Sequence, residues 1–571
     1  MQQKEVSIRA MSTTNDSSAT AIPRPSNPFV TALLTDLYQI TMAYAHWKNN
    51  RHNDPATFEL FFRKNPFHGE YTIFAGLDEC LKHLAHFTFT VDDVEYIKSL
   101  PQMKNCNPAF FDWLLMLDAS EVTVYAMKDG TVCFPKEPLI VVEAPLAVGQ
   151  LLETTLLTLV NFPSLIATNA ARMVRAATSP DRVPPTTLIG RKKGPRCVEF
   201  GMRRAQGPDG AMSASKYSQI GGFVGTSNVQ AGKLLDAELS GTHAHSFVQA
   251  YASLDEVKTL TVTHKDTKES ILLLPLVKEQ REILAEEEDM AYATTNDGEL
   301  AAFTAYAAAF PDSFLCLVDT YDTLQSGLLN FIIVASVLFE KCGYRPKGIR
   351  LDSGDLASPS TECARILESF PWAWTLSIVV SNDINERTLY ELNSKEHAIN
   401  VYGIGTNLVT CQAQPALGCV YKLVQLNGSP RMKLSQDIGK MTIPGRKRPY
   451  RLYGSDGCPI LDVMLAPDES TPSKGKTILC RHPAMAQKRA NVTPSKVETL
   501  LFLVFRNGTL LDGVNPTIEE AREAVAKQLN MFHPEILRRK DPKPYKVSLS
   551  DKLYKFLHEM WENASIIPEL H

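Results

Sequence analysis

The residues best suited to chemistry gather between Val198 and Tyr251. They begin with Glu199-Phe-Gly-Met-Arg-Arg-Ala-Gln-Gly-Pro-Asp-Gly210, which combines an aromatic residue, three glycines and two adjacent arginines in a stretch that we expect to be non-helical. Arginine binds phosphate or carboxylate through paired hydrogen bonds, and glycine lets the backbone approach such a group closely. A surface loop with salt-bridged arginines is the alternative, but the polar segments that follow favour an anion-binding site.

Two further polar segments follow this stretch, Gly221-Gly-Phe-Val-Gly-Thr-Ser-Asn228 and Gly241-Thr-His-Ala-His245. Glycine with Thr and Ser after a strand can form a nest of backbone N–H groups around an anion. His243 and His245 would point to the same face of a strand, yet without a nearby Cys or carboxylate partner they make a poor metal site. We therefore expect His245 to react, as an acid/base or as a covalent phosphate acceptor, rather than to be a core histidine bonded by backbone.

A series of βα units is expected to position residues such as these. Buried β-branched runs alternate with helical segments between residues 315 and 404, which indicates a parallel sheet or barrel with its chemistry just after each strand. The expected strands are 315–318, 348–350, 376–380 and 399–404, and helices are expected from Thr323, Pro359 and Asn385. The residues that follow these strands suit Mg²⁺, phosphate or ribose hydroxyls, and they are Asp319, Asp322, Asp352, Asp355, Ser381, Asn382, Gly405 and Thr406.

The pattern of the whole chain predicts the α/β class, with an irregular α/β barrel, an N-terminal α+β domain and a smaller C-terminal region. We assign a disordered tail to 1–27, the α+β domain to 28–160, the barrel-like catalytic domain to 161–410, and a C-terminal region that packs on the N-terminal domain to 411–571. The tail is rich in Ser, Thr, Asn and Pro and lacks an apolar signal core.

Three other segments have a recognisable character. A long apolar helix is expected over 151–175, broken only by Pro163. Residues 178–196 are rich in Pro, Arg and Lys, and residues 279–290 form an acidic helical run, so both are expected to be solvated surface. The pair His83 and His86 resembles two metal ligands but has no third ligand in sight, so we expect packing or surface roles for both.

The composition excludes several classes of partner. Lys and Arg number 59 against 63 Asp and Glu, so no basic field exists to hold nucleic acid or an anionic membrane. The 11 cysteines are scattered without a CxxC pair, which favours reduced thiols and a cytosolic location. The longest apolar run, 327–339, is interrupted by Asn330 and Ser336 and is too short to span a bilayer, so we expect a buried helix.

Several dispersed motifs, in the same order, are similar to those of the nicotinate phosphoribosyltransferase family of animal type, among the type II phosphoribosyltransferases. They are the run 198–248, Leu351-Asp-Ser-Gly-Asp-Leu356, Tyr402-Gly-Ile-Gly-Thr406 and Thr35-Asp-Leu-Tyr38. The resemblance extends from about Asn27 to the C-terminus and leaves out the tail and the insertion at 178–196.

The resemblance implies an enzyme that joins nicotinate to phosphoribosyl pyrophosphate, giving nicotinate mononucleotide and pyrophosphate for NAD biosynthesis. It implies Mg²⁺ as cofactor and ATP as co-substrate, with ATP hydrolysis coupled through a phosphohistidine that falls on His245. It also implies a homodimer. Departure of pyrophosphate leaves an oxocarbenium-like ribose carbon, so cationic groups must stabilise the leaving group while a carboxylate faces the cation.

The resemblance also assigns individual residues. Phe200 and Tyr38 are expected to hold the pyridine ring between them, with Tyr38 reaching across the dimer interface. The catalytic residues are expected to be His245, Arg350 and Asp352, the last of these lying near the ribose. The remaining substrate-binding residues are expected to be Arg203, Ser227, Thr242, Gly405 and Thr406, of which Gly405 and Thr406 hold the 5′-phosphate.

Ser227 bears on the choice of base. The related nicotinamide phosphoribosyltransferase carries an aspartate in this segment, where it can accept a hydrogen bond from the carboxamide, whereas this chain reads Gly225-Thr-Ser227. An aspartate would repel the carboxylate of nicotinate, and a serine can donate to it. Ser227 therefore favours the acid over the amide.

Two other functions fit the sequence less well. Purine and pyrimidine phosphoribosyltransferases carry two adjacent acids followed by Thr-Gly, whereas Leu317-Val-Asp-Thr-Tyr-Asp-Thr323 has separated acids and no following glycine. The second alternative is a metabolite-binding protein that has kept the fold and lost activity, but the expected histidine, arginines and acids are all present.

Overall fold

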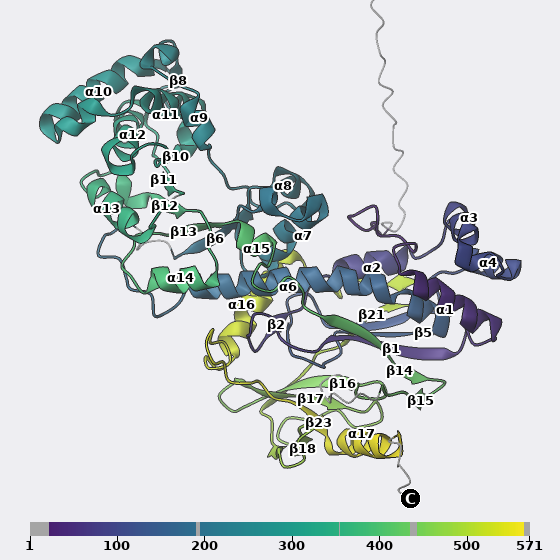
Figure 1. Ribbon diagram of the computed structural model, residues 1–571. Helices are drawn as coiled ribbons and strands as arrows, with labels where there is room; N and C mark the ends of the chain where they lie inside the picture. Colours follow the sequence, from purple (N-terminus) through teal and green to yellow (C-terminus); the bar gives the residue numbers. More distant parts are fainter. Residues whose placement is uncertain (1–21, 190–193, 353, 434–441, 565–571) are drawn as a thin grey trace, which may run out of the picture.

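The computed structural model describes residues 22–189, 194–352, 354–433 and 442–564, which form three large sheets and the helices around them (Figure 1). Residues 1–21 of the predicted tail lie outside the described residues. The end of that tail contacts the N-terminal region, because Ser26 donates to Glu79 through its backbone N–H (2.8 Å) and its hydroxyl (2.7 Å).

A seven-stranded antiparallel sheet forms the centre of the N-terminal region. In order across the sheet its strands are β15 (Ser429–Pro430), β14 (Cys419–Leu426), β1 (Pro55–Phe62), β5 (Ile140–Pro145), β3 (Thr123–Ala126), β21 (Phe502–Arg506) and β22 (Thr509–Leu510). Four of these strands come from beyond residue 411. The C-terminal part of the chain therefore completes the N-terminal sheet.

Helices and a short strand pair surround this sheet. They are α1 (Leu37–Lys48), α2 (Leu77–Ala85), α3 (Val91–Ser99), α4 (Pro108–Leu115), α5 (Leu146–Leu151) and the pair β2 (Thr72–Ile73) and β4 (Val132–Cys133). His83 is buried, and the His86 ring bonds to the Lys82 carbonyl. The described residues contain no group of three or more His, Cys, Asp or Glu side chains placed to hold a metal ion.

The long helix α6 (Glu153–Ala177) joins the two halves of the molecule, as Figure 1 shows. It contains Pro163 and matches the helix expected over 151–175. Ser164 and Thr168 accept hydrogen bonds from the N-terminal region, and Asn169 donates to the carbonyl of Asn407 in the catalytic region at 2.9 Å. Polar side chains of α6 therefore form hydrogen bonds with both the N-terminal region and the catalytic region.

The catalytic region contains a six-stranded parallel sheet that forms a half barrel, which confirms the α/β class and the barrel-like architecture expected from the sequence. In order its strands are β10 (Leu315–Leu317), β11 (Gly348–Leu351), β12 (Ser377–Val380), β13 (Val401–Ile404), β6 (Arg196–Glu199) and β7 (Gly225–Thr226). The four strands expected from β-branched runs form within two residues of their expected ends.

Helices alternate with these strands, as the sequence predicts. They are α7 (Gly207–Ile220), α8 (Val229–Leu235), α9 (His245–Gln249), α10 (Leu273–Glu287), α11 (Asp297–Ala309), α12 (Leu328–Cys342), α13 (Ala357–Leu367), α14 (Glu386–Asn393) and α15 (Thr406–Val409), with a small hairpin of β8 (Thr261–Thr263) and β9 (Ser270–Leu272). The acidic run predicted to be solvated falls on α10 and just beyond it, where Glu282 and residues 286–288 are exposed.

Helix α12 lies in the core of the catalytic region, where residues 328–338 are all buried. This confirms the prediction of a buried helix over 327–339. Two helical stretches, 146–177 and 323–342, are long and apolar enough to cross a membrane, but 61% and 72% of their most apolar windows are buried inside the protein. Such burial is typical of core helices.

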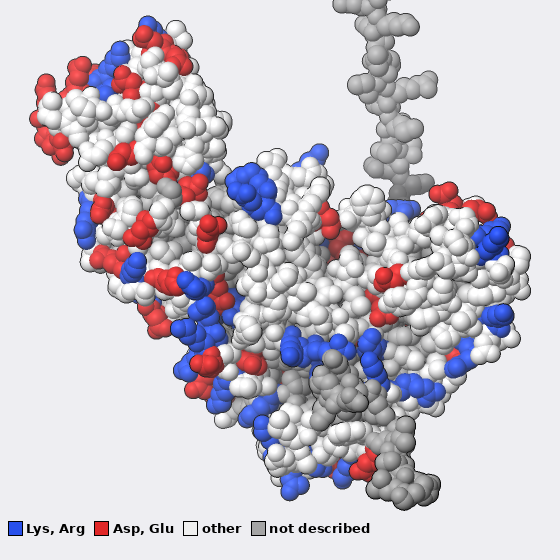
Figure 2. Space-filling model, in the orientation of Figure 1, with Lys and Arg blue, Asp and Glu red and all other residues white. Residues whose placement is uncertain are grey.

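The third sheet lies beyond the N-terminal sheet and is mixed. In order its strands are β19 (Arg489–Val492), β18 (Ile478–Arg481), β23 (Val547–Ser550), β17 (Pro459–Leu465), β16 (Arg448–Tyr453) and β20 (Lys496–Thr499). Helices α16 (Ile518–Met531) and α17 (Asp551–Ala564) belong to the same C-terminal part of the chain. On the face drawn in Figure 2, basic side chains gather in a band across the lower half of the molecule, and acidic side chains gather at the tip that carries α10.

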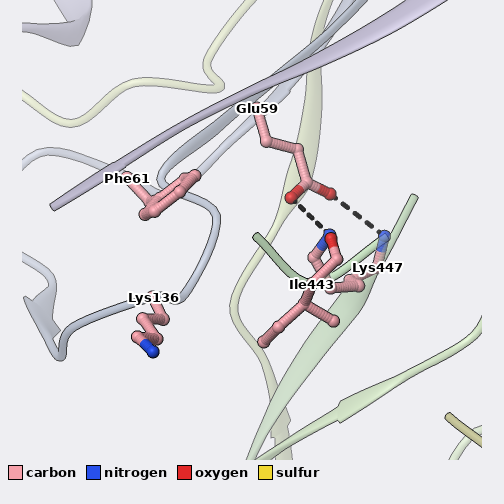
Figure 3. A pocket seen from close by; sticks show the side chains of 5 residues that line it. All are labelled: Glu59, Phe61, Lys136, Ile443 and Lys447. Carbon is pink, nitrogen blue, oxygen red and sulfur yellow. Dashed lines mark hydrogen bonds and ion pairs between the residues drawn. The ribbon is translucent and has the colours of Figure 1, made fainter. Parts of the chain in front are cut away.

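Two buried ion pairs lie in or beside the third sheet, and one of them joins it to the N-terminal sheet. Lys447 donates to Glu59 of β1 at 2.7 Å, and their side chains are 2% and 1% exposed (Figure 3). The guanidinium of Arg451 on β16 bonds both carboxylate oxygens of Asp462 on β17, at 2.9 and 2.7 Å, and donates to the carbonyl of Val132 at 2.7 Å. Since Val132 lies in β4, Arg451 links the third sheet to the β2–β4 strand pair.

Replacing Arg451 with methionine is expected to destabilise the protein by about 3–5 kcal/mol, because Asp462 would keep a wholly buried carboxylate without its cation. The measurement is the thermal or urea unfolding of the variant beside the wild type. Arg522→Met is the matched control, since Arg522 makes a largely exposed pair with Glu519 and should cost less than about 0.5 kcal/mol. Equal losses in the two variants would contradict the role given to Arg451.

Candidate active site

The candidate site lies at the carboxyl ends of the half-barrel strands, where the backbone of each strand turns into a loop. Phe200 follows β6, Ser227 follows β7, Asp352 follows β11 and Gly405 follows β13. Because neighbouring parallel strands end at the same edge, these side chains are held on one side of the sheet. The structure therefore places these residues after the strands, as expected from the sequence.

His245 is held between two strand ends. Its Nδ1 lies 3.1 Å from Thr320 Oγ1, and its Nε2 lies 3.8 Å from Asp352 Oδ2. The side chains of His245 and Asp352 are 39% and 35% exposed, so a ligand can reach both. Thr320 fixes one ring nitrogen and leaves Nε2 without a hydrogen bond among the described residues. That nitrogen is the one available for proton or phosphoryl transfer.

His243 differs from its neighbour, and the expectation that the two histidines share a face was wrong. Residues 241–244 form a loop rather than a strand, and His245 begins α9. The His243 ring is buried, accepts the Leu317 N–H at 3.3 Å and packs edge-on against Tyr306. Burial, assisted by the nearby guanidinium of Arg350, lowers the pKa of His243 to about 4, so this ring is neutral. His243 is the core histidine and His245 the exposed one.

Arg350, the third residue of β11, braces the loop that carries the histidines. Its guanidinium donates to Thr242 Oγ1 at 3.0 Å and to the His243 carbonyl at 3.2 Å. Burial lowers the pKa of Arg350, whereas the carboxylates of Asp352 and Asp319 raise it. The cation thus lies beside two acids and spans the gap between β11 and the 242–245 loop.

Asp352 is oriented from both sides. Its backbone N–H donates to Asp319 Oδ2 at 2.7 Å, and Ser381 Oγ donates to its Oδ1. These contacts join the ends of β10, β11 and β12. They hold the Asp352 carboxylate toward His245 and the open side of the half barrel, where a positively charged reaction centre would be stabilised.

The ring of Phe200 lies directly over the backbone of β13. A Cβ atom built on Gly403 would stand 2.3 Å from Phe200 Cδ2, and one built on Gly201 would stand 2.4 Å from Val409 Cγ1. Only glycine leaves room at these positions. The stretch 199–210 is not wholly non-helical as expected, because a 3₁₀ turn forms at 202–204 and α7 begins at Gly207.

The other predicted residues lie less close together. Arg203 is exposed in the 3₁₀ turn and is near enough to Arg350 to lower the pKa of that guanidinium. Thr406 begins α15, directly after Gly405. Tyr38 lies on α1 and is 47% exposed, and Figure 1 shows α1 on the opposite side of the molecule from the half-barrel sheet. One chain alone does not bring Tyr38 to Phe200.

Sequence reasoning missed three polar residues of the site. Thr320 was passed over although it lies between two predicted acids in the loop after β10, and that position was the available signal. Glu199 was noted only as the first residue of the stretch 199–210, without a role of its own. Glu299 bonds Ser326 and Asn330 beneath the same loop, and burial raises its pKa to about 7. Nothing in the residues around Glu299 marks it in the sequence.

Family models and known proteins of one family match this chain over most of its length. The model of the nicotinate phosphoribosyltransferase (NAPRTase) family matches residues 196–456, and the models of its N-terminal and C-terminal domains match residues 33–161 and 446–557. Nicotinate phosphoribosyltransferase 1 of Arabidopsis thaliana is 47% identical over 97% of this chain and 98% of its own length. The Homo sapiens nicotinate phosphoribosyltransferase is 41% identical over 97% of this chain and 100% of its own.

Two solved structures are similar to the structure of this chain. The crystal structure of human nicotinic acid phosphoribosyltransferase superposes with a TM-score of 0.81 at 40% identity, covering 92% of this chain and 99% of that one. The nicotinate-nucleotide pyrophosphorylase of Pyrococcus furiosus shares the fold, with a TM-score of 0.56 at 18% identity over 90% of this chain and 99% of that one. This chain belongs to the nicotinate phosphoribosyltransferase family.

Proposed function

We propose that this protein joins nicotinate to phosphoribosyl pyrophosphate, forming nicotinate mononucleotide and pyrophosphate in the salvage route to NAD. The observation that carries the proposal is the convergence of His245, Arg350 and Asp352 at one end of a half barrel in a chain that matches the family over its full length. Incubation of the purified protein with both substrates should yield the two products in equal amounts. Consumption of phosphoribosyl pyrophosphate without mononucleotide would contradict it.

The side chains fit the charges of this reaction. As the bond from the ribose carbon to pyrophosphate breaks, the carbon becomes positive and the leaving group gains negative charge. Asp352, fixed by Ser381 and by its own N–H, supplies a carboxylate for the carbon. Arg350 and Arg203 supply guanidinium groups for phosphate oxygens. The nitrogen of the pyridine ring, stacked on Phe200, then forms the new bond to carbon.

Mg²⁺ fits this site as a cofactor. The ion usually binds proteins through one or two carboxylates and takes its other oxygen ligands from substrate phosphates and water. Asp319 and Asp352 lie together at the ends of β10 and β11 and would hold it. When bound, Mg²⁺ would neutralise charge on the pyrophosphate oxygens.

We propose that ATP hydrolysis is coupled to the reaction through a phosphate on His245. In that step the ring nitrogen attacks the γ-phosphorus of ATP, the bond to the β-phosphate oxygen breaks, and ADP leaves. Two features support this role: Nε2 lies open to ligand while Thr320 anchors Nδ1, and Arg350 lies in the adjoining loop contact. A phosphate on His245 would add about two negative charges beside the pyrophosphate and alter its affinity.

The choice of base is proposed to depend on Ser227. Its backbone N–H donates to the Glu199 carbonyl at 2.9 Å, and its half-buried side chain lies one strand away from Phe200. Ser227→Asp is expected to raise the KM for nicotinate by about tenfold or more, because a carboxylate would face the carboxylate of the substrate. Steady-state kinetics with nicotinate and nicotinamide measures the change. The neutral Ser227→Asn separates charge from size, and an equal effect in both variants would reject the charge argument.

We propose that the protein works as a homodimer in which Tyr38 of one subunit completes the ring site of the other. Support comes from two exposed apolar groups that a single chain leaves uncovered. One lies on and before α1 and comprises Phe29, Leu37, Tyr38 and Met42, and the other lies around α8 beside the site and comprises Met202, Val229, Leu234 and Leu239. Mutual covering of these two surfaces would bring Tyr38 to Phe200.

We propose a cytosolic location for the protein. All 11 cysteines are free, and nine of them are buried. Free buried thiols are typical of proteins that function in a reducing compartment.

A further inference from the structure

Glu199 is a buried carboxylate placed between two segments that face the substrate. It is the last residue of β6, its side chain is wholly buried, and it directly precedes Phe200. A carboxylate at such a position is costly unless several donors satisfy it, and an apolar residue would fill the same space at less cost. The identity of its donors therefore indicates why an acid is present.

The first donor comes from the segment that carries the aromatic ring. Oε1 of Glu199 accepts the backbone N–H of Gly201, so the carboxylate closes a tight turn around Phe200. Gly201 in turn touches Val409 and the Gly405 carbonyl so closely that no side chain fits there. The turn that presents the Phe200 ring is thus fixed from inside the protein by Glu199.

The other donors come from the segments that carry Ser227. Oε2 of Glu199 accepts from Ser215 Oγ at 2.9 Å and from Thr226 Oγ1 at 2.5 Å. The Asn228 N–H donates to Thr226 Oγ1 at 3.0 Å, and the Asn228 amide donates to Ser215 Oγ at 3.1 Å. Both neighbours of Ser227 are therefore tied, directly or through one hydroxyl, to the same carboxylate.

We propose that Glu199 is a positioning residue that sets the distance between the Phe200 ring and the Ser227 hydroxyl, and through them the pose of the pyridine base. The inference rests on the proposed function, since it concerns the base of that reaction. A side chain with two acceptor oxygens can hold the turn after β6 and the end of β7 at once. The phosphate-binding groups on β11 and β13 make no hydrogen bond to it among the described residues.

The test is Glu199→Gln, which keeps the size of the side chain. Its amide nitrogen cannot accept, so one of the two anchored segments loses its acceptor. We expect the KM for nicotinate to rise about ten- to a hundredfold, which corresponds to loss of a hydrogen bond to a buried carboxylate. The KM for phosphoribosyl pyrophosphate should rise less than the KM for nicotinate, because Arg350 and Asp352 make no hydrogen bond to Glu199 or to its donors among the described residues.

Two further variants distinguish positioning from simple loss of stability. Ser218→Ala removes a buried hydroxyl from the same helix α7, one that has no hydrogen bond among the described residues, and should leave both KM values unchanged. Thr226→Val removes one donor to Glu199 and should raise the KM for nicotinate. Combined with Glu199→Gln it should add little, because both changes break the same connection.

The results distinguish failure of the positioning role of Glu199 from failure of the proposed function. A parallel rise of both KM values together with a lower melting temperature would reduce Glu199 to a structural residue, and additive effects of the two changes would do the same. A Glu199→Gln variant with the wild-type KM for nicotinate would reject the inference. A wild-type protein that does not use nicotinate would reject the proposed function instead.

Discussion

Replacing His245 with asparagine is expected to lower kcat/KM for nicotinate, measured with ATP, by about 10²- to 10⁴-fold, the range for removal of a positioned histidine. The reason is the placement of the ring: Thr320 holds Nδ1 at 3.1 Å and Asp352 lies 3.8 Å from Nε2 in an open site. Asparagine keeps polarity and approximate size but has no nucleophilic nitrogen. The remaining activity should no longer respond to ATP.

The covalent step has its own readout. ATP labelled at the γ-phosphate should leave an acid-labile label on the wild type and none on His245→Asn. His86→Asn is the matched control and should keep both label and activity, since the His86 side chain lies on the N-terminal region and hydrogen-bonds only the Lys82 carbonyl among the described residues. Wild-type protein that never acquires the label would rule out the phosphohistidine.

Replacing Arg350 with lysine is expected to lower kcat/KM by about 10²- to 10³-fold, although the charge is kept. Arg350 donates to Thr242 Oγ1 and to the His243 carbonyl with two different nitrogens, and a single ammonium group cannot reproduce that geometry. The 242–245 loop, and His245 with it, would lose its brace while a phosphate oxygen loses its paired donors. Steady-state kinetics with both substrates measures the loss.

Arg203→Lys is the comparison for this variant. Arg203 is exposed and has no hydrogen bond to the histidine loop among the described residues, so its replacement should cost less than that of Arg350. Arg350→Lys within about threefold of the wild type would show that charge alone matters at this position. The hydrogen bonds from Arg350 to Thr242 and to the His243 carbonyl would then not be needed for activity.

The βα series was predictable because its signal is local. The runs at 315–318 and 376–380 are β-branched and apolar, and the polar residues that follow them mark the strand ends. The same logic placed Asp352 and Gly405 directly after strands, where the structure has them. In contrast, strands β14 and β21 join the N-terminal sheet from far along the chain, and no local pattern reports a pairing such as Leu60 with Tyr421.

The hydrogen-bond and packing partners of the site residues could also not be predicted from the sequence. His243 and His245 have the same side chain two positions apart, and only the packing of Tyr306 and the Leu317 N–H shows which one is buried. Thr320 and His245 are 75 positions apart in the chain. Glu199 looks like part of a glycine and arginine motif until the fold brings three donors to its carboxylate. Tertiary contacts decide such roles.

The most direct test of the central claim compares nicotinate with nicotinamide as the base, each with phosphoribosyl pyrophosphate and Mg²⁺, in the presence and absence of ATP. The site around Phe200 and Ser227 predicts a higher kcat/KM for nicotinate, and His245 predicts that ATP increases it. Faster turnover of nicotinamide, with or without ATP, would contradict the account.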